Sequence, residues 1–464
     1  MKGMTLDAMA KACRGQLLGA NDRCFLNAQG IVIDSRKIQQ DYVFVAVRGE
    51  RTDGHEYISQ VFTDGALAVI CEHPLNIHKP YILVKSTKQA LMDLAAFYLS
   101  QLDITTVGIT GSVGKTSTKE MIASVLSQKY NVHKTEGNLN NEIGLPLTIF
   151  KIQEQHQVAV LEMGISDFGE MHRLASVTRP NIAVITNIGL SHLKDLKSRD
   201  GIMKAKTEMF DHLPEGAAVI LNGDDDKLST IGQVNGTAPV FYGIGREKPQ
   251  TAVYSEKTVY AEDIEPMGLQ GTHLTIHCGS DVVKAQIPIP GKHCAYNALA
   301  AAAVGKQLGL SNDEIRAGIE QIQTIDGRTN LIQTNNMTII DDCYNANPIS
   351  MKASIDVLAT ACGRTIAVLG DMGDLGEEEH EMHYDVGKHL AQKGIQVLFC
   401  AGTLAADIAK AAREHSTECD VHVFADRDEM LAELLPFLKE GDAVLVKASH
   451  FMKFSTVVES IITM

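Results

Sequence analysis

The segment TVGITGSVGKTSTKEMIASVL, residues 106–126, constrains the fold of this chain more than any other. Its β-branched start predicts a buried strand, its glycine-rich middle a tight turn, and its end a helix. Glycines let backbone N–H groups approach phosphate oxygens, and the N-terminus of a helix favours negative charge. The segment therefore predicts a phosphate-binding loop within an α/β domain.

Seven consecutive residues of this loop are candidates for nucleotide binding: Gly111, Ser112, Val113, Gly114, Lys115, Thr116 and Ser117. We expect Lys115 to reach the β- and γ-phosphates and the Thr116 hydroxyl to ligate Mg²⁺. The match to the usual G-x-x-x-x-G-K-[ST] pattern is imperfect, because Ile109 stands at the first glycine position. A purely structural glycine-rich turn is the alternative.

Two further side chains follow apolar runs that predict parallel strands. Glu162 ends the run VAVLEMG, and His192 follows IAVIT in NIGLSHL. The carboxyl ends of parallel strands face the ligand crevice, so both side chains are candidate ligands of a nucleotide's Mg²⁺. The alternatives are a solvated strand-end carboxylate and a loop histidine that is only hydrogen-bonded.

Several polar residues have no functional signature in the pattern alone. Lys206, in MKAKTEMF, is typical of a helix surface, and Asn297, Asp341 and Asp342 are typical of helix caps and turns. The segment EHEMH, residues 379–383, resembles a metal-binding helix. Its histidines are three residues apart with no evident third ligand, so we interpret it as a solvated helix face.

The length of 464 residues indicates about three domains. Residues 1–102 alternate short apolar runs with helical patterns, including an expected helix over 87–102. Residues 103–327 contain β-branched runs typical of buried parallel strands, and from Val253 to Pro290 the pattern alternates as in antiparallel strands. Residues 328–464 repeat a strand–loop–helix rhythm, with a hinge expected at 326–328.

Composition excludes some classes of function. The net charge is −15, from 42 basic and 57 acidic residues, which argues against a nucleic-acid-binding surface. The first residues lack the apolar core of a signal peptide, and no apolar run is long enough to span a bilayer. The nine cysteines form no C-x-x-C pair, which favours a reducing, cytoplasmic compartment.

Ten motifs occur in a characteristic order: TGSVGKTS, GNLNNEIGLPLT, LEMG, TNIGLSHL, AKTEMF, NALAAAAVG, DGR, DDCYNANPISM, GDMGDLG and LVKAS. In this order they resemble the Mur ligase family over essentially the whole chain, and most of all its branch that adds D-alanyl-D-alanine. The resemblance implies three α/β domains: a UDP-sugar-binding domain (1–102), a central ATP-binding domain with a P-loop parallel sheet and added antiparallel strands (103–327), and a C-terminal Rossmann-like domain binding the incoming dipeptide (328–464).

The resemblance also implies a reaction, the ATP-dependent ligation of D-alanyl-D-alanine to a UDP-N-acetylmuramoyl-tripeptide through an acyl phosphate, in peptidoglycan precursor synthesis. Its cofactors would be ATP and Mg²⁺, and we expect a cytoplasmic monomer without a nucleic-acid or membrane partner. Another Mur-type or folylpolyglutamate-type ligase, or a nucleotide-binding regulator without catalysis, remain alternatives. A mechanical P-loop ATPase is excluded because no apolar strand ends in a suitably spaced metal-binding Asp.

The resemblance assigns roles to residues that match its motifs. Metal ligands would be Thr116, Glu162, His192 and Lys206, the last as a carbamate. ATP contacts beyond the loop would be Asn297 for adenine, Arg328 for the γ-phosphate and Asp342 near the ribose. Substrate contacts would be Ser35 and Arg36 for the uridine diphosphate, Asn138, Asn140 and Asn141 for the acceptor, and Asn345 and Asn347 for the dipeptide.

Two residues depart from the family pattern. Cys294 stands where an Asn usually follows the His, which puts a polar contact from that position in doubt. His450 stands where the family usually has Arg, and a neutral imidazole would hold a dipeptide carboxylate less firmly than a bidentate guanidinium.

Overall fold

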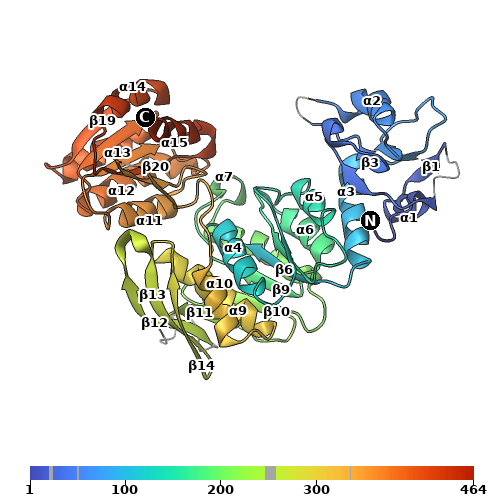
Figure 1. Cartoon of the computed structure of the whole chain (residues 1–464), viewed down its shortest axis with the longest axis horizontal. Helices are drawn as coiled ribbons and strands as arrows, with labels where there is room; N and C mark the ends of the chain where they lie inside the picture. The colour runs from blue at the N-terminus through green and yellow to red at the C-terminus, as the bar shows by residue number, and fades with distance from the viewer. Residues whose placement is uncertain (20–24, 50–51, 246–257, 335) are drawn as a thin grey trace. The chain divides into compact units, whose positions relative to one another are not determined.

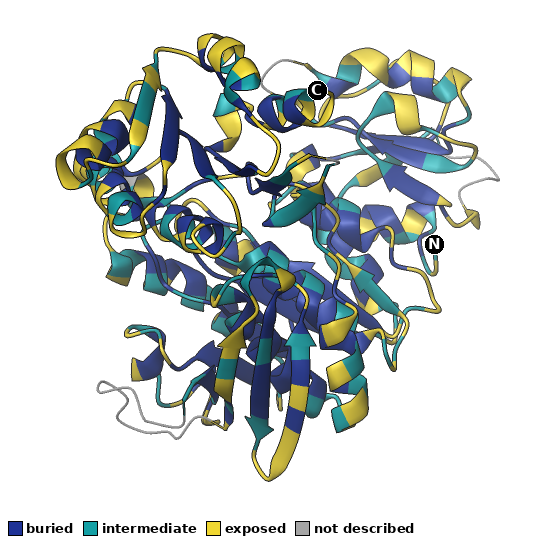
Figure 2. Ribbon diagram, turned by 60° about the vertical axis from the view of Figure 1, so that its left-hand side comes forward, coloured by how far each residue is buried: buried dark blue, intermediate teal, exposed yellow. Residues whose placement is uncertain are grey.

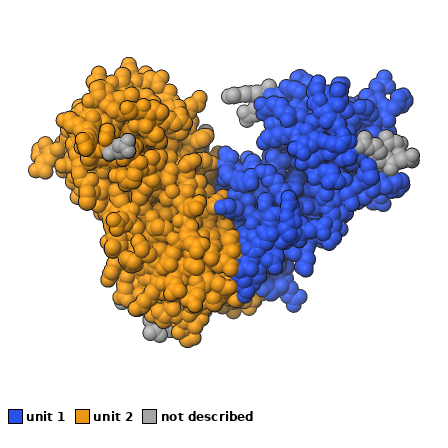
Figure 3. All heavy atoms as spheres, in the orientation of Figure 1, with its two compact units in different colours: residues 1–110, 129–184, 205–218 blue, residues 111–128, 185–204, 219–464 orange. Residues whose placement is uncertain are grey.

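A computed structural model describes residues 1–19, 25–49, 52–245, 258–334 and 336–464. Contacts divide the chain into two compact units (Figure 3). Unit 1 comprises residues 1–110, 129–184 and 205–218, and unit 2 comprises residues 111–128, 185–204 and 219–464. The strands form sheets of five, nine and six strands within the described ranges, and most strand pairs are parallel. The expected α/β class is confirmed, whereas the expected domain borders stay a prediction.

The first sheet of unit 1 has the strand order β1-β5-β4-β3-β2 (Figure 1). The short apolar runs predicted β2 to β5, which pair in parallel, and β1, which we did not predict, pairs antiparallel with β5. The elements are α1 (Leu6–Ala12), β1 (Gln16–Leu18), β2 (Gly30–Val32), β3 (Tyr42–Val45), α2 (Ile58–Thr63), β4 (Ala68–Cys71), β5 (Tyr81–Leu83) and α3 (Thr87–Ser100).

The remaining strands of unit 1 are β6, β7, β8 and β9. β8 pairs in parallel with β6 on one side and with β7 on the other, and its five residues are all buried. Burial on both faces explains why this strand is continuously apolar until its last residue. The elements are β6 (Thr105–Thr110), β7 (Val132–Lys134), α5 (Gly144–Ile149), β8 (Val158–Glu162), α6 (Glu170–Thr178) and β9 (Ile182–Ile185).

Unit 2 begins with the helix that follows the glycine-rich turn. β10, β11 and β12 are parallel, and β12, β13 and β14 are antiparallel, as the alternating pattern predicted. Residues 253–257 of that predicted stretch lie outside the described ranges. The elements are α4 (Lys115–Leu126), α7 (Leu193–Leu196), α8 (Arg199–Thr207), β10 (Ala218–Asn222), β11 (Val240–Ile244), β12 (Val259–Pro266), β13 (Thr272–Cys278), β14 (Asp281–Ile287), α9 (His293–Gln307) and α10 (Asn312–Glu320).

The last sheet has the order β15-β16-β20-β17-β18-β19, and all of its pairs are parallel except β15 with β16. Figure 2 colours buried residues dark blue, and β17, β18 and β20 of this sheet are buried along their whole length. The elements are β15 (Asn330–Gln333), β16 (Thr338–Asp341), α11 (Pro348–Leu358), β17 (Thr365–Gly370), α12 (Glu379–Gln392), β18 (Val397–Ala401), α13 (Ala405–His415), β19 (Asp420–Phe424), α14 (Arg427–Phe437), β20 (Ala443–Lys447) and α15 (Ser455–Ile462).

Alternate residues of these strands feed two apolar clusters. Leu445 of β20 packs in the cluster formed with α11, α12 and α13, whereas Val444 and Val446 pack in the cluster formed with α14 and α15. Helices therefore cover both faces of the sheet, which explains why strands such as β17 and β18 are almost wholly apolar. No helix in the described ranges combines the length and the hydropathy needed to cross a bilayer.

Candidate active site

The glycine-rich turn leaves β6 after Thr110 and enters α4 at Lys115. Gly111 has φ 151° and Gly114 has φ 81°. A Cβ at Gly111 would lie 1.9 Å from Thr186 Oγ1, so this position admits only glycine. Ile109, at the missing first glycine position, is a buried residue of the strand itself. The turn thus starts two residues later than the usual pattern places it.

The turn is held by the segment that follows β9. Thr186 Oγ1 donates to the carbonyl of Val113 (2.7 Å), and Val113 N–H donates to Asn187 Oδ1 (3.0 Å). Gly189 N–H donates to Ser112 Oγ (2.9 Å). Thr186 and Asn187 belong to the motif TNIGLSHL, but we had not assigned them a role. Their side chains fix the backbone of the turn, and Asn187 accepts the N–H groups of both Ser112 and Val113.

His192 ends this same segment and caps α7 in the left-handed conformation, with φ 60° and ψ 32°. A non-glycine residue in this region is strained, and such strain clusters at functional sites. The left-handed backbone turns the chain immediately after the residues that bind the glycine-rich turn. His192 therefore lies at a turn of unit 2 that directly follows the residues bonded to the glycine-rich turn.

Asn297 lies inside α9 and is buried, so the expectation of a capping residue was wrong. Its Oδ1 accepts a hydrogen bond from Thr118 Oγ1 (2.9 Å), which fixes the amide orientation against α4. Asn297 lines a cavity of about 20 Å³ together with Ser117, Cys294 and Arg328. This volume holds a water-sized molecule, so a nucleotide base would enter only after the cavity walls separate.

Arg328, which belongs to the expected hinge, lies close to the glycine-rich turn. Its Nη2 lies 3.4 Å from Thr116 Oγ1, and its guanidinium lies over the ring of Tyr344 with 4.0 Å between Cζ and the ring centroid. Unit 2 therefore brings together three of the predicted nucleotide contacts, namely the turn, Asn297 and Arg328.

Asp342 is a buried acceptor rather than a solvated turn residue. Its Oδ1 accepts from Thr329 N–H (3.0 Å), and its Oδ2 lies 2.5 Å from Lys447 Nζ. Lys447 also donates to the carbonyls of Asp342 and Asn345. We had not predicted a role for Lys447, although it stands in the motif LVKAS. With both oxygens of Asp342 bonded inside the protein, its expected ribose contact stays a prediction.

The predicted dipeptide residues lie near this ion pair. Asn347 caps α11, with Oδ1 accepting from Ser350 N–H (2.9 Å), and Asn345 is exposed. His450 is also exposed, and its ring centroid lies 5.5 Å from that of Tyr344. Cys294, the other departure from the family pattern, is buried and donates its thiol to the Pro290 carbonyl. Burial raises the pKa of Cys294 to about 12, so its thiol stays neutral.

Glu162 of unit 1 is buried, so the alternative of a solvated strand-end carboxylate is wrong. Asn140 Nδ2 donates to Glu162 Oε1 (2.8 Å), and Thr135 Oγ1 accepts from the Glu162 N–H (2.9 Å). A Cβ at Gly164 would lie 2.9 Å from Asn140 Nδ2. The loop of candidate asparagines therefore packs directly on the candidate metal ligand.

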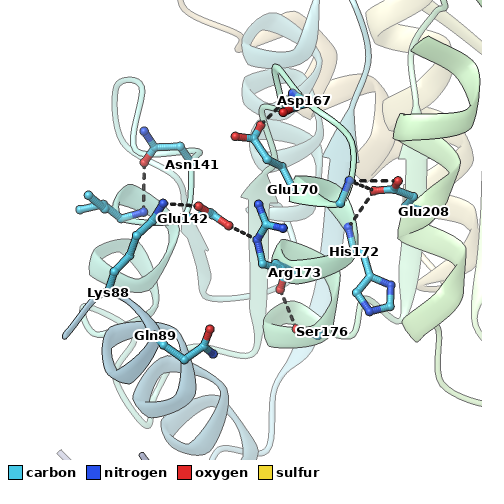
Figure 4. A network of polar contacts seen from close by, with 12 residues as sticks. Lys88, Gln89, Asn141, Glu142, Asp167, Glu170, His172, Arg173, Ser176 and Glu208 are labelled. Carbon is cyan, nitrogen blue, oxygen red and sulfur yellow. Dashed lines mark hydrogen bonds and ion pairs between the residues drawn. The ribbon is translucent and has the colours of Figure 1, made fainter. Parts of the chain in front are cut away.

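The rest of this loop is held by an ion network that the sequence did not reveal (Figure 4). Asn141 Oδ1 accepts from the N–H groups of Ile143 and Gly144, while Asn138 is exposed. Glu142 binds Lys88 of α3 and Arg173 of α6. Burial alone would raise the pKa of Glu142, but its two cationic partners hold it below the usual value.

Lys206, in α8, is one of the most buried side chains of the protein, with 2% exposure. The alternative of an ordinary surface lysine is therefore wrong. Glu208, two residues later, accepts backbone N–H bonds at the start of α6 from Gly169 (3.0 Å) and His172 (3.3 Å). These bonds fix the chain just beyond Lys206 (Figure 4).

Ser35 and Arg36 form a short 3₁₀ helix after β2, spanning Ser35–Lys37. The Arg36 guanidinium makes a bidentate pair with Asp34, at 2.9 and 2.8 Å, and is otherwise exposed. The hydrogen bonds from Arg36 lower the pKa of Asp34. This pairing orients Arg36 outward, where an anionic group can reach it.

The segment 379–383 is only partly a solvated helix face. His380 is exposed and contacts Asp407, but His383 is fully buried, so the expectation was wrong for His383. Its Nδ1 donates to the Glu379 carbonyl and its Nε2 accepts from Met372 N–H (2.9 Å). In the described ranges, no three His, Cys, Asp or Glu side chains form a metal site.

A sizeable cavity in the described ranges lies away from these residues. It has a volume of about 770 Å³ and lies in unit 2, between β12 and helix α11. None of the predicted site residues lines it. Cavity volume alone therefore does not identify the candidate active site of this chain.

Comparison with protein families assigns three consecutive matches. The Mur ligase family catalytic domain matches residues 27–99, the Mur ligase middle domain matches 109–305, and the Mur ligase glutamate ligase domain matches 327–450. The chain belongs to the Mur ligase family. The resemblance found in the motifs is thereby confirmed.

Relatives within the Mur ligases match almost the whole chain. The UDP-N-acetylmuramoyl-tripeptide–D-alanyl-D-alanine ligase of Bacillus subtilis is 38% identical and covers 93% of each chain. A crystal structure of MurF from Acinetobacter baumannii is 31% identical, covers 99% of each chain and has a TM-score of 0.87. MurF from Thermotoga maritima, solved in complex with ADP, is 29% identical, has a TM-score of 0.82, and covers 94% of this chain and 97% of its own.

Proposed function

We propose that this chain ligates D-alanyl-D-alanine to a UDP-N-acetylmuramoyl-tripeptide at the expense of ATP, in peptidoglycan precursor synthesis. The observation that carries the proposal is the full-length similarity to ligases of that name, at 38% and 34% identity. The similarity includes residues 27–99, where the resemblance places a UDP-sugar-binding domain. A folylpolyglutamate-type ligase would not need such a domain, so that alternative is disfavoured.

The reaction has two chemical steps. The terminal carboxylate of the tripeptide attacks the γ-phosphorus of ATP, the bond to the β–γ bridging oxygen breaks, and ADP leaves. The amine of D-alanyl-D-alanine then attacks the acyl phosphate carbonyl and loses a proton, and inorganic phosphate leaves as the amide forms. The first step brings two anions together, so the protein must neutralise charge and hold the reactants in line.

Lys115 and Arg328 supply that positive charge in the proposal. Lys115 lies at the first position of α4, and its Nζ donates to the Gly111 carbonyl (2.9 Å), close to the turn it would serve. Arg328 contacts Thr116 Oγ1 at 3.4 Å. We place the β- and γ-phosphates at residues 111–117, the adenine beside Asn297 and the ribose near Asp342.

Thr116, Glu162 and His192 would hold Mg²⁺. The donor chemistry fits, because a hydroxyl and a carboxylate are hard oxygen ligands, and Glu162 is oriented by Asn140 as metal-binding carboxylates commonly are by neighbouring donors. When bound, Mg²⁺ would neutralise phosphate charge and so favour attack by the carboxylate. The chain's own contribution is to fix Thr116 in the first turn of α4, Glu162 at the end of β8 and His192 at the N-cap of α7.

Lys206 would act as a carbamate. Burial of a lysine as complete as that of Lys206 is costly for an ammonium unless its charge is compensated or changed, and reaction of the neutral amine with CO₂ turns it into a carboxylate-like ligand. The burial of Lys206 already excludes the alternative that it is an ordinary lysine on a helix surface. The carbamate is supported by this burial together with the family resemblance.

Substrate contacts complete the proposal. Ser35 and Arg36 would bind the uridine diphosphate, and Asn138, Asn140 and Asn141 would face the acceptor peptide. Asn345, Asn347 and His450 would face the dipeptide. We expect a monomer, and free thiols at the described cysteines favour a cytoplasmic location.

The deciding experiment measures phosphate release from ATP by the purified chain. We expect release only when D-alanyl-D-alanine and a UDP-tripeptide carrying L-lysine or meso-diaminopimelate are both present. L-alanine, D-glutamate or glutamate with a folate acceptor serve as matched alternatives to the dipeptide. Release with one of these instead would identify another ligase of the group. No release with any pair, despite ATP binding, would identify a regulator without catalysis.

A further inference from the structure

The aromatic ring of Tyr344 lies against the cation that faces the glycine-rich turn. The Arg328 Cζ is 4.0 Å from the centroid of the Tyr344 ring, and Nη2 of the same guanidinium is 3.4 Å from Thr116 Oγ1. A planar guanidinium stacks well on an aromatic face, because the ring quadrupole attracts the cation. Tyr344 thus limits the rotamers of Arg328 to those that point toward Thr116.

The backbone around Arg328 is tied to the same loop. Tyr344 N–H donates to the Gly327 carbonyl (3.1 Å), and Gly327 N–H donates to Asp341 Oδ2 (2.8 Å). Gly327 has φ 72°, and a Cβ there would lie 3.0 Å from the Tyr344 Cβ. The close approach of these two segments therefore requires glycine at 327.

The residue after Arg328 is bonded in the same way. Thr329 has φ 49° and donates its N–H to Asp342 Oδ1 (3.0 Å). Both neighbours of Arg328 are consequently bonded to the acidic pair that precedes Tyr344. The loop fixes the backbone of Arg328, and the tyrosine ring fixes its side chain.

We propose that Tyr344 is a positioning residue that holds the Arg328 guanidinium toward the phosphate-binding turn. The proposal rests on the proposed function, in which Arg328 contacts the γ-phosphate. The other neighbour of the ring is His450, whose centroid is 5.5 Å away at an interplanar angle of 41°. Tyr344 therefore lies between the cation that stabilises phosphoryl transfer and a residue of the dipeptide side.

The first test separates positioning from hydrogen bonding by the phenol. Tyr344→Phe keeps the aromatic face, so kcat should stay within about twofold of the parent. Tyr344→Leu removes the face, and kcat for phosphate release should fall about 10- to 100-fold with a smaller change in the KM for ATP, since the cation acts mainly on the transition state. Tyr384→Leu, at a half-buried tyrosine of α12, is the matched control and should behave like the parent.

The second test is chemical rescue. Arg328→Ala should be nearly inactive, and millimolar methylguanidinium should restore part of its activity by stacking on Tyr344. The double variant Arg328→Ala/Tyr344→Leu should show no rescue. A merely structural role for Tyr344 would not make rescue depend on the ring. If Tyr344→Leu does not fold, as judged by circular dichroism, Tyr344→Met replaces it in both tests.

The outcomes distinguish this inference from the proposed function. Parent-like kcat in Tyr344→Leu, or equal rescue with and without the ring, overturns the positioning role while an inactive Arg328→Ala leaves the function intact. Full activity in Arg328→Ala would instead show that Arg328 does not contact the γ-phosphate, and it would overturn the positioning role of Tyr344 as well.

Discussion

Nζ of Lys447 lies 2.5 Å from Oδ2 of Asp342, and both residues are buried. The pair joins the end of β20 to the loop after β16, the loop that carries Tyr344 and Asn345. Lys447 also donates to the Asn345 carbonyl at 3.1 Å. One buried cation thus fixes the backbone of the loop at which we place the dipeptide.

Loss of this cation should destabilise the protein. Lys447→Met leaves Asp342 as a buried charge without its partner, and we expect the free energy of unfolding to fall by about 3–5 kcal/mol. Urea denaturation measures the change. Lys11→Met, which breaks an exposed pair with Asp7, is the control and should cost no more than about 1 kcal/mol. Equal losses of unfolding free energy for the two substitutions would show that the buried pair contributes no more to stability than the exposed pair.

Lys115→Ala should abolish most phosphoryl transfer while the fold survives. The charge acts locally on phosphate oxygens, so a rate loss on the order of 10²–10⁴ is expected for one preorganised cation. Phosphate release and thermal unfolding measure the two properties. Lys129→Ala, at an exposed lysine just beyond α4, should leave both unchanged. Activity of Lys115→Ala within about threefold of the parent would refute the assignment of the phosphate-binding turn.

Lys206→Ala should be nearly inactive, and acetate should restore part of the activity by occupying the position of the carbamate. We expect a loss of at least about 10² in rate, because a charged group near the reacting phosphate is removed. Lys204→Ala, an exposed residue of the same helix, is the matched control. Mass spectrometry of a CO₂-trapped sample tests the modification directly. An active Lys206→Ala variant without the modification would end this hypothesis.

His450→Arg should tighten the binding of D-alanyl-D-alanine. A guanidinium can bind a carboxylate through two parallel hydrogen bonds, which an imidazole cannot. We expect the KM for the dipeptide to fall several-fold, with kcat little changed. His415→Arg adds the same charge at another exposed site and should have no effect. An unchanged KM in His450→Arg would place residue 450 outside the dipeptide site.

His383 should make the stability of the protein depend on pH. Burial lowers the pKa of His383, despite the opposing effects of the Glu379 carbonyl and nearby carboxylates. The unfolded chain takes up this proton below about pH 6.5, so the free energy of unfolding should fall as the pH decreases below that value.

The substitution His383→Gln tests this dependence. It should cost about 1–3 kcal/mol at pH 7.5, because Met372 N–H loses its well-placed acceptor, and it should reduce the loss of stability between pH 7.5 and 5.5. His380→Gln, at the exposed neighbour, should change neither quantity. Parallel stability–pH curves for His383→Gln and the parent would show that His383 does not titrate in this range.

The sequence by itself determined the local elements of this protein. The glycine-rich turn between β6 and α4, the apolar strands and the alternating strands β12 to β14 were predicted correctly, because periodicity and glycine act within a few residues. β1 escaped prediction because its three residues, QLL, are not buried and lie outside any longer apolar run, unlike the equally short β2 and β5. The motif order was enough to indicate the family.

Only the tertiary structure decided which polar side chains are buried and which partners they meet. Lys447 reaches Asp342 across 105 residues, and Thr118 reaches Asn297 across 179. In the sequence, Lys206 and His383 have the pattern of surface helix residues, yet the fold buries both. The physical reason is that burial and long-range hydrogen bonds depend on how the elements pack, whereas the sequence around each residue specifies only its own element.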